Sequence, residues 1–168
     1  MIATEVTTLN RLFEDFREDS KIWIYTSNRF FTGQEVEALN AQIAVFTREW
    51  TAHDIALKAT GAVLFNRFIV LTVDESQTTA SGCSIDKSAG FIRGVERALE
   101  VNLFDRLTII YEGTSGLESF HLNEIKTIID SGNFNLNTNI FDTTVLNLGA
   151  LRAGFIKEAG NSWLKRFI

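Results

Sequence analysis

The residues of this chain best suited to chemistry lie in the polar stretch Ser81-Gly-Cys-Ser-Ile-Asp-Lys-Ser88, which contains the only cysteine. The apolar spacing that follows predicts a helix, with Ser84 as its N-cap. Unpaired amide groups and the positive end of the helix dipole favour anions at such a helix start. We therefore predict a candidate anion or ligand site formed by Ser81, Gly82, Cys83, Ser84 and Lys87. The simpler alternative is that these residues only begin the helix, with Cys83 as a small buried side chain.

A second hypothesis makes Cys83 a catalytic nucleophile, because a helix N-terminus favours the thiolate form. His53 is then the candidate general base, and Asp74 or Glu75 is the candidate group that orients it. This set predicts a thiol-dependent hydrolase or transferase. The same four side chains are acceptable metal ligands. No paired spacing such as H-x-x-x-H or C-x-x-C is present, so we expect neither a metal nor another cofactor.

The elements that would position these residues alternate between strands and helices. We predict strands over 21–27, 61–65, 68–73, 107–111 and 117–121. We predict helices over about 4–18, from the capping box Thr32–Glu35 onward, from Ser84 onward, over about 123–130 and over about 143–158. A tight turn at Asn66-Arg67 joins the second strand to the third.

The order strand–helix–strand–strand–helix–strand over residues 21–112 is that of a ferredoxin-like plait. The sequence therefore predicts an α+β fold with this antiparallel sheet as its core. Residues 1–20 would add an N-terminal helix, and residues 113–168 would form a C-terminal helical extension. The chain has no proline and no linker-like segment, so we expect a single domain over 1–168.

The predicted strands are apolar on both faces, whereas a half-exposed antiparallel sheet alternates apolar with polar residues. Both faces of the sheet should therefore be covered. The two plait helices would cover one face. The terminal extensions, or a second subunit in a homodimer, would cover the other.

The plait topology would sort the loops onto two edges of the sheet. The lower edge would collect Trp50, His53, Asp74, Glu75 and Glu112 beside the start of the second plait helix. The upper edge would collect Arg29, Arg67 and Arg106, a weaker candidate site for a carboxylate or phosphate. The simpler alternative for the upper edge is that asparagine suits tight turns and that Asp105 pairs with one of the arginines.

Composition limits the functional classes. The 168 residues carry a formal net charge of −5, and the basic residues are scattered, which argues against a nucleic-acid partner. A single cysteine cannot form an intramolecular disulfide. No apolar stretch approaches the length that spans a bilayer, and the acidic N-terminal residues do not look like a signal peptide. We expect a cytoplasmic protein that binds neither nucleic acid nor membrane.

Several short segments carry a family resemblance: Trp23-Ile-Tyr25, Asn28-Arg29, Trp50-Thr-Ala-His53, Asn66-Arg67-Phe68, Val73-Asp74-Glu75-Ser76, Ala80 to Ser88, Phe104-Asp-Arg106 and Ser162 to Phe167. From about Ile22 onward the chain resembles an uncharacterised bacterial family commonly labelled "ABC transporter ATPase". The resemblance implies that label but no established activity.

ATP hydrolysis of the ABC type requires the phosphate-binding loop G-x-x-x-x-G-K-[ST]. The nearest match here places Ser81 and Asp86 at the two glycine positions, before Lys87 and Ser88. Asp86 would put a negative charge beside the triphosphate, and no L-S-G-G-Q signature is present. We therefore predict that the protein is not a P-loop ATPase. The leading hypothesis is a small-molecule-binding, anion-binding or interaction domain. Its alternatives are the Cys83–His53 enzyme and a structural homodimeric adaptor.

Overall fold

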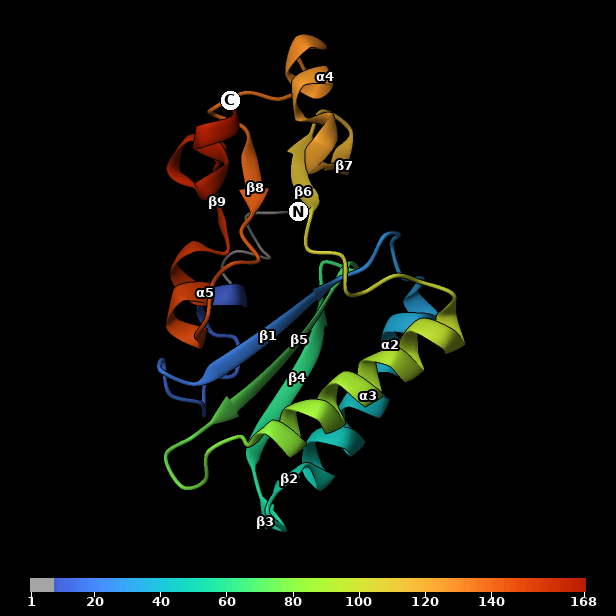
Figure 1. The fold of residues 1–168 in the computed structure, drawn as a ribbon, viewed down its shortest axis with the longest axis vertical. Coiled ribbons are helices and arrows are strands. Elements are labelled where there is room, and N and C mark those ends of the chain that lie inside the picture. The colour runs from blue at the N-terminus through green and yellow to red at the C-terminus, as the bar shows by residue number, and fades with distance from the viewer. Residues whose placement is uncertain (1–7) are drawn as a thin grey trace. The chain divides into compact units, whose positions relative to one another are not determined.

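A computed structural model describes residues 8–168 (Figure 1). The fold combines helices with antiparallel sheets, which confirms the α+β class. Contacts divide the chain into two compact units. Unit 1 runs to Asp105 and includes Leu146–Arg152, and unit 2 comprises Arg106–Val145 and Ala153–Ile168. The single-domain organisation over 1–168 stays a prediction.

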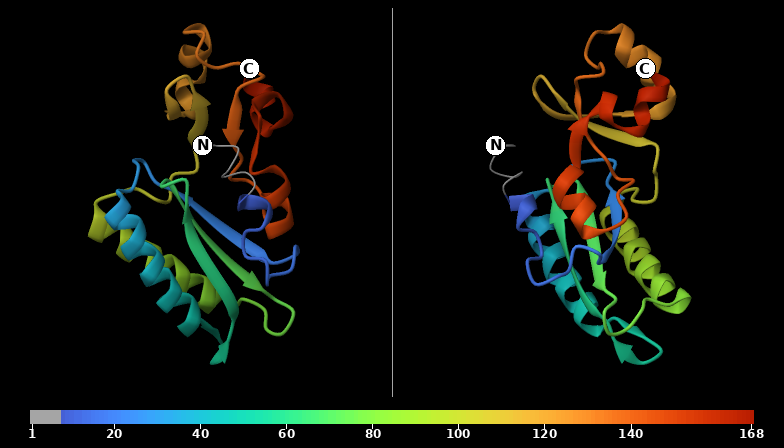
Figure 2. Two further views of the ribbon diagram at one scale, coloured as in Figure 1. Left: turned by 180° about the vertical axis from the view of Figure 1, so that it is seen from behind. Right: turned by 90° about the vertical axis from the view of Figure 1, so that its left-hand side faces the viewer.

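Unit 1 contains a three-stranded antiparallel sheet in the order β1-β5-β4. Its strands are β1 (Lys21–Thr26), β4 (Lys58–Leu64) and β5 (Phe68–Asp74). Helices α2 (Gly33–Glu49) and α3 (Gly82–Leu99) lie on one face of the sheet (Figures 1 and 2). A small hairpin of β2 (Thr51–Ala52) and β3 (Ile55–Ala56) follows α2, in a stretch that the sequence did not predict as strands.

Local sequence signals place two of these elements correctly. Thr32 caps α2, and the predicted capping box with Glu35 is present. Between β4 and β5, Phe65 and Asn66 both have positive φ, and the Arg67 amide donates to the Leu64 carbonyl at 3.0 Å. Positive φ at both central residues is the requirement of a type I′ hairpin turn.

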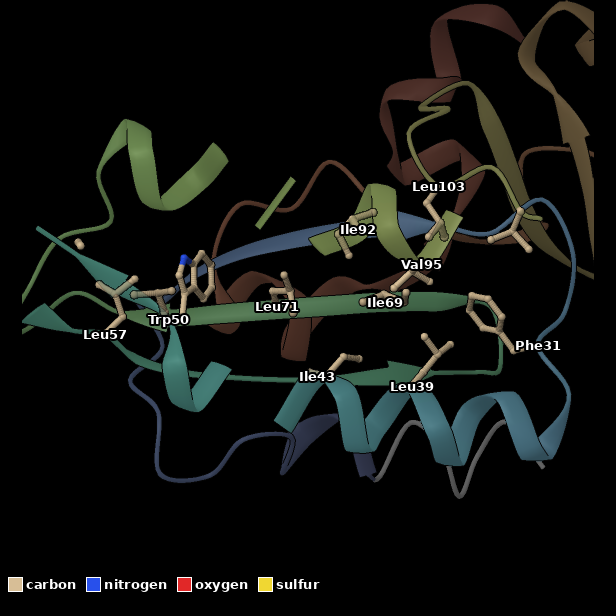
Figure 3. Close-up of a cluster of buried hydrophobic side chains, with 13 residues drawn as sticks. Phe31, Leu39, Ile43, Trp50, Leu57, Ile69, Leu71, Ile92, Val95 and Leu103 are labelled. Atoms are coloured by element: carbon tan, nitrogen blue, oxygen red, sulfur yellow. The ribbon is translucent and has the colours of Figure 1, made fainter. Parts of the chain in front are cut away.

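The main core of unit 1 lies between the sheet and the two helices (Figure 3). Its buried members come from both helices, from β5 and from the segments around them: Phe31, Leu39, Ile43, Trp50, Ala52, Leu57, Ile69, Leu71, Val73, Ile92, Val95, Val101 and Leu103. Three alternate residues of β5 are in this set, so successive side chains point to opposite faces of the strand.

The opposite face of the sheet is buried as well. Phe68, Val70 and Thr72 of β5 alternate with the core residues and have no exposed surface. Residues from 8 to 20 and the start of α5 (Leu148–Gly154) lie along this face (Figure 2). The Leu148 amide donates to the Ser20 carbonyl at 2.9 Å, which links the two covering segments. The prediction that both sheet faces are covered is confirmed for unit 1.

The predicted N-terminal helix over 4–18 is wrong in its extent. Residues 1–7 lie outside the described part of the chain. Residues 8–10 are helical, and turns replace the helix from residue 11. Phe13 has a φ of 54°, a left-handed conformation that a helix does not continue through. Arg152 then donates to the Leu12 and Phe13 carbonyls at 2.7 and 2.8 Å.

Unit 2 contains a second antiparallel sheet in the order β7-β6-β8-β9. Its elements are β6 (Thr108–Gly113), β7 (Gly116–His121), η1 (Leu122–Glu124), α4 (Ile125–Asp130), β8 (Asn139–Phe141), β9 (Ile156–Glu158), η2 (Ala159–Asn161) and η3 (Trp163–Phe167). Its core is aromatic, with Tyr111, Phe120 and Phe134 packed edge to face or tilted.

The ferredoxin-like plait is not confirmed, because the expected fourth strand belongs to unit 2. Residues 107–111 lie largely in β6, which pairs with β7 across a tight turn and with β8 at Tyr111. Within unit 1, Asn147 bridges to Lys21 at the free edge of β1, and the Leu146 carbonyl accepts from the Ile22 amide there at 3.4 Å. In the plait, the strand at residues 107–111 would pair with β1. Here it pairs instead with β7, in the β6–β7 hairpin.

The predicted helix over 143–158 is also too long. Only α5 forms, and Ile156–Glu158 is strand β9, with Ile156 opposite Phe141 of β8. The apolar residues in this stretch have helical spacing, so the sequence predicted a helix throughout. The short strand β9 forms only because it pairs with β8, which is distant in sequence.

Candidate functional site

The candidate site at residues 81–88 comprises the N-cap and the first two turns of α3. The helix begins three residues earlier than predicted. Ser81, not Ser84, is the N-cap. The Ser84 amide donates to Ser81 Oγ at 3.2 Å, and the Ser81 amide donates to Ser84 Oγ at 2.7 Å. Ser84 is fully buried, and its carbonyl accepts a 2.8 Å hydrogen bond from Trp50 Nε1. Trp50, at the end of α2, thereby holds the start of α3.

The exposed residues of this stretch are Gly82, Cys83, Ile85, Asp86 and Lys87. The first amide bonded within the helix is that of Ile85, to the Ser81 carbonyl at 2.9 Å. Within residues 8–168, the Gly82 and Cys83 amides have no hydrogen-bond partner. Lys87 Nζ donates to Thr51 Oγ1 at 3.2 Å, and the first turn contains no acidic residue. Cys83 is exposed, so the alternative in which it is a buried side chain is wrong.

The start of α2 provides a comparison within the same fold. It has the same type of capping box, but its first turn carries Glu35. The Glu35 carboxylate accepts from the Thr32 amide at 2.8 Å and pairs with both terminal nitrogens of Arg29 at 2.9 Å. The Arg29 hydrogen bonds and the Thr32 amide lower the pKa of Glu35 to about 2. The positive end of α2 is thus already occupied by a carboxylate of the protein itself.

His53 lies in the turn of the β2–β3 hairpin with Asp54, and both have positive φ. Both side chains are exposed. Among the described residues, no hydrogen bond joins His53 to Cys83. The base and the nucleophile of the enzyme hypothesis are therefore not connected here.

Asp74 and Glu75 are held by lysines of the neighbouring strands. Asp74 is buried, accepts from the Ser76 amide at 2.9 Å and pairs with Lys58 Nζ at 3.1 Å. Glu75 pairs with Lys21 Nζ at 3.0 Å. Lys58 also donates to the Asp15 carbonyl at 2.8 Å. These contacts tie the end of β5 to β4, to β1 and to the N-terminal segment, which is a structural role.

The Asp74 carboxyl gives a test of this role. Hydrogen bonds from Ser76, together with Lys58, lower its pKa from 3.8 to about 2. A carboxyl whose pKa is lower in the folded state stabilises the fold above its unfolded pKa. That stabilisation is lost as the pH falls from 3.8 through about 2. We expect Asp74→Asn to reduce the free energy of unfolding by about 1–2 kcal/mol at neutral pH, after discounting for solvent screening around Lys58.

Urea unfolding of both proteins at several pH values measures this difference. It should shrink toward zero as the pH approaches 2. Thr60→Ala, a neutral change within β4, is a control whose effect should not depend on pH. A deficit of Asp74→Asn that stays constant with pH would contradict the assigned ion pair.

The three arginines expected at the upper edge have different environments. Arg29 pairs with Glu35 and donates to the Leu99 carbonyl at 2.8 Å. Arg67 is buried, donates to the Ser27 carbonyl at 2.7 Å, and lies over the Phe30 ring at 4.8 Å. Burial lowers the pKa of Arg67. Arg106 is exposed and belongs to unit 2. Arg29 and Arg67 hold the backbone around residues 27–30 and the end of α3.

Glu112, expected on the lower edge, lies in β6 of unit 2, where it accepts a 3.0 Å hydrogen bond from Asn139 Nδ2. Across residues 8–168, no group of three or more His, Cys, Asp or Glu side chains is arranged to hold a metal ion. None of the helices in that range is both long and apolar enough to cross a membrane. Independence from cofactors stays a prediction.

Sequence reasoning missed the outer surface between α2 and α3. A shallow groove there is lined by Ala41, Gln42, Val45, Phe46, Glu49 and Phe91. Val45 lies off the apolar stripe that packs on the sheet and is 45% exposed. The available signal in the sequence was Val45 itself, an apolar residue outside the predicted apolar stripe of the helix.

Comparisons of this chain with protein-family models, with curated proteins and with solved structures found no match. The resemblance described above therefore stays a prediction.

Proposed function

We propose that this protein is a non-catalytic binding domain that binds a small oxyanion, such as phosphate, at the first turn of α3. The observation that carries the proposal is the pair of unpartnered, exposed amides of Gly82 and Cys83 in a turn without acidic residues. Lys87 adds a positive charge in the next turn, where the neighbouring Asp86 is also exposed.

The electrostatics of the turn support an anion. Amide groups at a helix start carry about half a positive charge in total, and α3 is 18 residues long. The side chains of Ser81 and Ser84 satisfy each other's amides, which leaves those of Gly82 and Cys83 to face solvent. An exposed site of this kind binds weakly, so we expect dissociation constants in the millimolar range.

The same contacts favour binding over thiol catalysis. Asp74 and Glu75 already pair with Lys58 and Lys21, so neither orients His53. A general base must reach the proton that it removes, and no such contact joins His53 to Cys83 in the described chain.

The cytoplasmic location, the absence of a nucleic-acid or membrane partner and the family resemblance remain parts of this proposal. The finer fold proposal is that unit 1 is a plait-like module of three strands and two helices, because β1-β5-β4 is the order of the first three plait strands.

Titration with inorganic phosphate, followed by amide NMR, tests the proposal. We expect saturable shifts of the Gly82 and Cys83 amides, and a roughly threefold or greater loss of affinity in Lys87→Gln, because one of the positive charges at the site is removed. Lys126→Gln removes the same charge from an exposed position in unit 2 and should leave the affinity unchanged.

The Gly33 and Gln34 amides at the start of α2 are the internal control. The Glu35 carboxylate should keep phosphate away from them, so they should not shift. Equal shifts at both helix starts, or none at Gly82 and Cys83, would overturn the proposal.

A further inference from the structure

The outer surface of the α2–α3 layer has an apolar centre. Phe46 and Phe91 stack at 4.5 Å with an interplanar angle of 6° and form the floor of the groove described above. Ala41 and Val45 form its α2 wall and are exposed. Burying such a surface against a partner is favourable in proportion to the apolar area removed from water.

The α3 side of the same surface has open space. A Cβ atom added at Gly90 or Gly94 would meet nothing within 4 Å. Two glycines one helical turn apart therefore leave a shallow depression in α3. Side chains from an opposing helix can enter it without any rearrangement of this chain.

Helices α2 and α3 run antiparallel. Three contacts between them fix which residues of the two helices lie at the same level, that is, at the same height along the helix axes. Trp50 contacts Ser84 at one end. Phe46 stacks on Phe91 in the middle. At the other end, Arg29 joins Glu35 to the Leu99 carbonyl. By this correspondence Val45 lies level with Gly90.

The exposed charges on the two helices have opposite signs at the same levels. The same correspondence places Glu37 level with Arg97, Arg48 level with Asp86, and Glu49 level with Lys87. All six side chains are exposed, and none forms an ion pair with any of residues 8–168.

We propose that a second copy of this chain packs on this surface about a two-fold axis that runs along the groove. Rotation about such an axis keeps every residue at its level and places α2 of one copy over α3 of the other. Val45 of each copy then enters the depression at Gly90 of its partner. Each of the three charge pairs forms twice, because a two-fold interface repeats every contact. Like-signed helices would instead repel.

Burial elsewhere in unit 1 supports this choice of surface. The other face of the sheet, which the sequence offered as a dimer interface, has its β5 side chains fully buried by the chain itself. The outer surface of α2 and α3 remains exposed and self-complementary. This inference goes beyond the proposed anion site. The variants described below leave Lys87 unchanged, so that the test of the interface does not depend on phosphate binding.

A charge-reversal experiment tests the interface. Variant A carries Glu37→Lys and Asp86→Lys, so that residues 37, 48, 86 and 97 are all positive. Variant B carries Arg48→Glu and Arg97→Glu, so that the same positions are all negative. Sedimentation equilibrium in phosphate-free buffer should show a dimer for the natural chain. Each variant alone should dissociate with a constant at least tenfold higher, since four like-charged contacts replace four attractive ones.

An equimolar mixture of variants A and B should restore the dimer as a heterodimer, because every contact is again between opposite charges. Asp15→Lys with Asp130→Lys makes the same charge change as variant A at exposed positions outside α2 and α3, and this control should remain dimeric. Circular dichroism confirms that each variant is folded. A monomeric natural chain at high concentration, unchanged dimers of A and B, or no restoration on mixing would each overturn the proposal.

Discussion

Replacement of Trp50 by alanine is expected to lower the free energy of unfolding by about 3–5 kcal/mol, the usual range for a large buried aromatic residue. Trp50 is 1% exposed and packs against Trp23 and Phe46 at centroid distances of 5.7 and 5.1 Å. Its indole nitrogen also donates to the Ser84 carbonyl in the first turn of α3. The change therefore opens a cavity and removes the contact that fixes the candidate site.

Urea unfolding followed by far-ultraviolet circular dichroism measures the loss. Trp50→Phe separates the two causes, since it keeps most of the packing but removes the hydrogen bond, which is worth about 0.5–1.5 kcal/mol. Phosphate-induced shifts at Gly82 should weaken in both variants. A loss below about 1 kcal/mol for Trp50→Ala would show that the core does not depend on this side chain.

Gly61→Ala is expected to destabilise the protein by about 1–3 kcal/mol, the typical cost of overpacking. Gly61 lies in β4, directly under α2. A Cβ there would approach the Val70 carbonyl oxygen at 2.6 Å and a methyl carbon of Ile43 at 2.8 Å. The helix or the strand would have to move, because one of these atoms belongs to the backbone.

Gly33→Ala is the matched control, because an added Cβ at this first helical position meets nothing within 4 Å. Thermal unfolding should show a clear drop in the midpoint for Gly61→Ala and little change for Gly33→Ala. Equal effects of the two substitutions would mean that α2 does not pack on β4 as closely as described.

Elements of the fold that depend on neighbouring residues could be predicted from the sequence. The capping box at Thr32 and the hairpin turn at Asn66 are local signals, and both elements formed where expected. The position of the fourth strand of the plait depends on residues that are distant in sequence. Residues 107–111 have the composition of a strand in either sheet, and the hairpin with β7 decides the outcome. The short strands β8 and β9 likewise depend on each other, and even their closest partners in sequence, Phe141 and Ile156, are 15 positions apart.

The candidate site shows the same limit. Ser81 and Ser84 are both acceptable N-caps, and sequence alone did not reveal that Ser84 is buried beneath Trp50. Asp74 and Glu75 looked like candidate orienting groups until the register of the sheet brought Lys58 and Lys21 beside them. The role of these two carboxylates could therefore not be predicted without knowing that lysines from two other strands lie beside them.

Unit 1 is discontinuous in sequence, and this has a consequence for the order of events during synthesis. Strand β5 is complete at Asp74, but Leu148 and Leu151, which belong to the segment along its second face, are made much later. At ribosomal rates, residues 106–152 take about 2–9 s to appear. During that interval Phe68 and Val70 lack part of their final cover. A nascent chain paused within unit 2 should therefore bind holdase chaperones, and release should follow once α5 has left the exit tunnel.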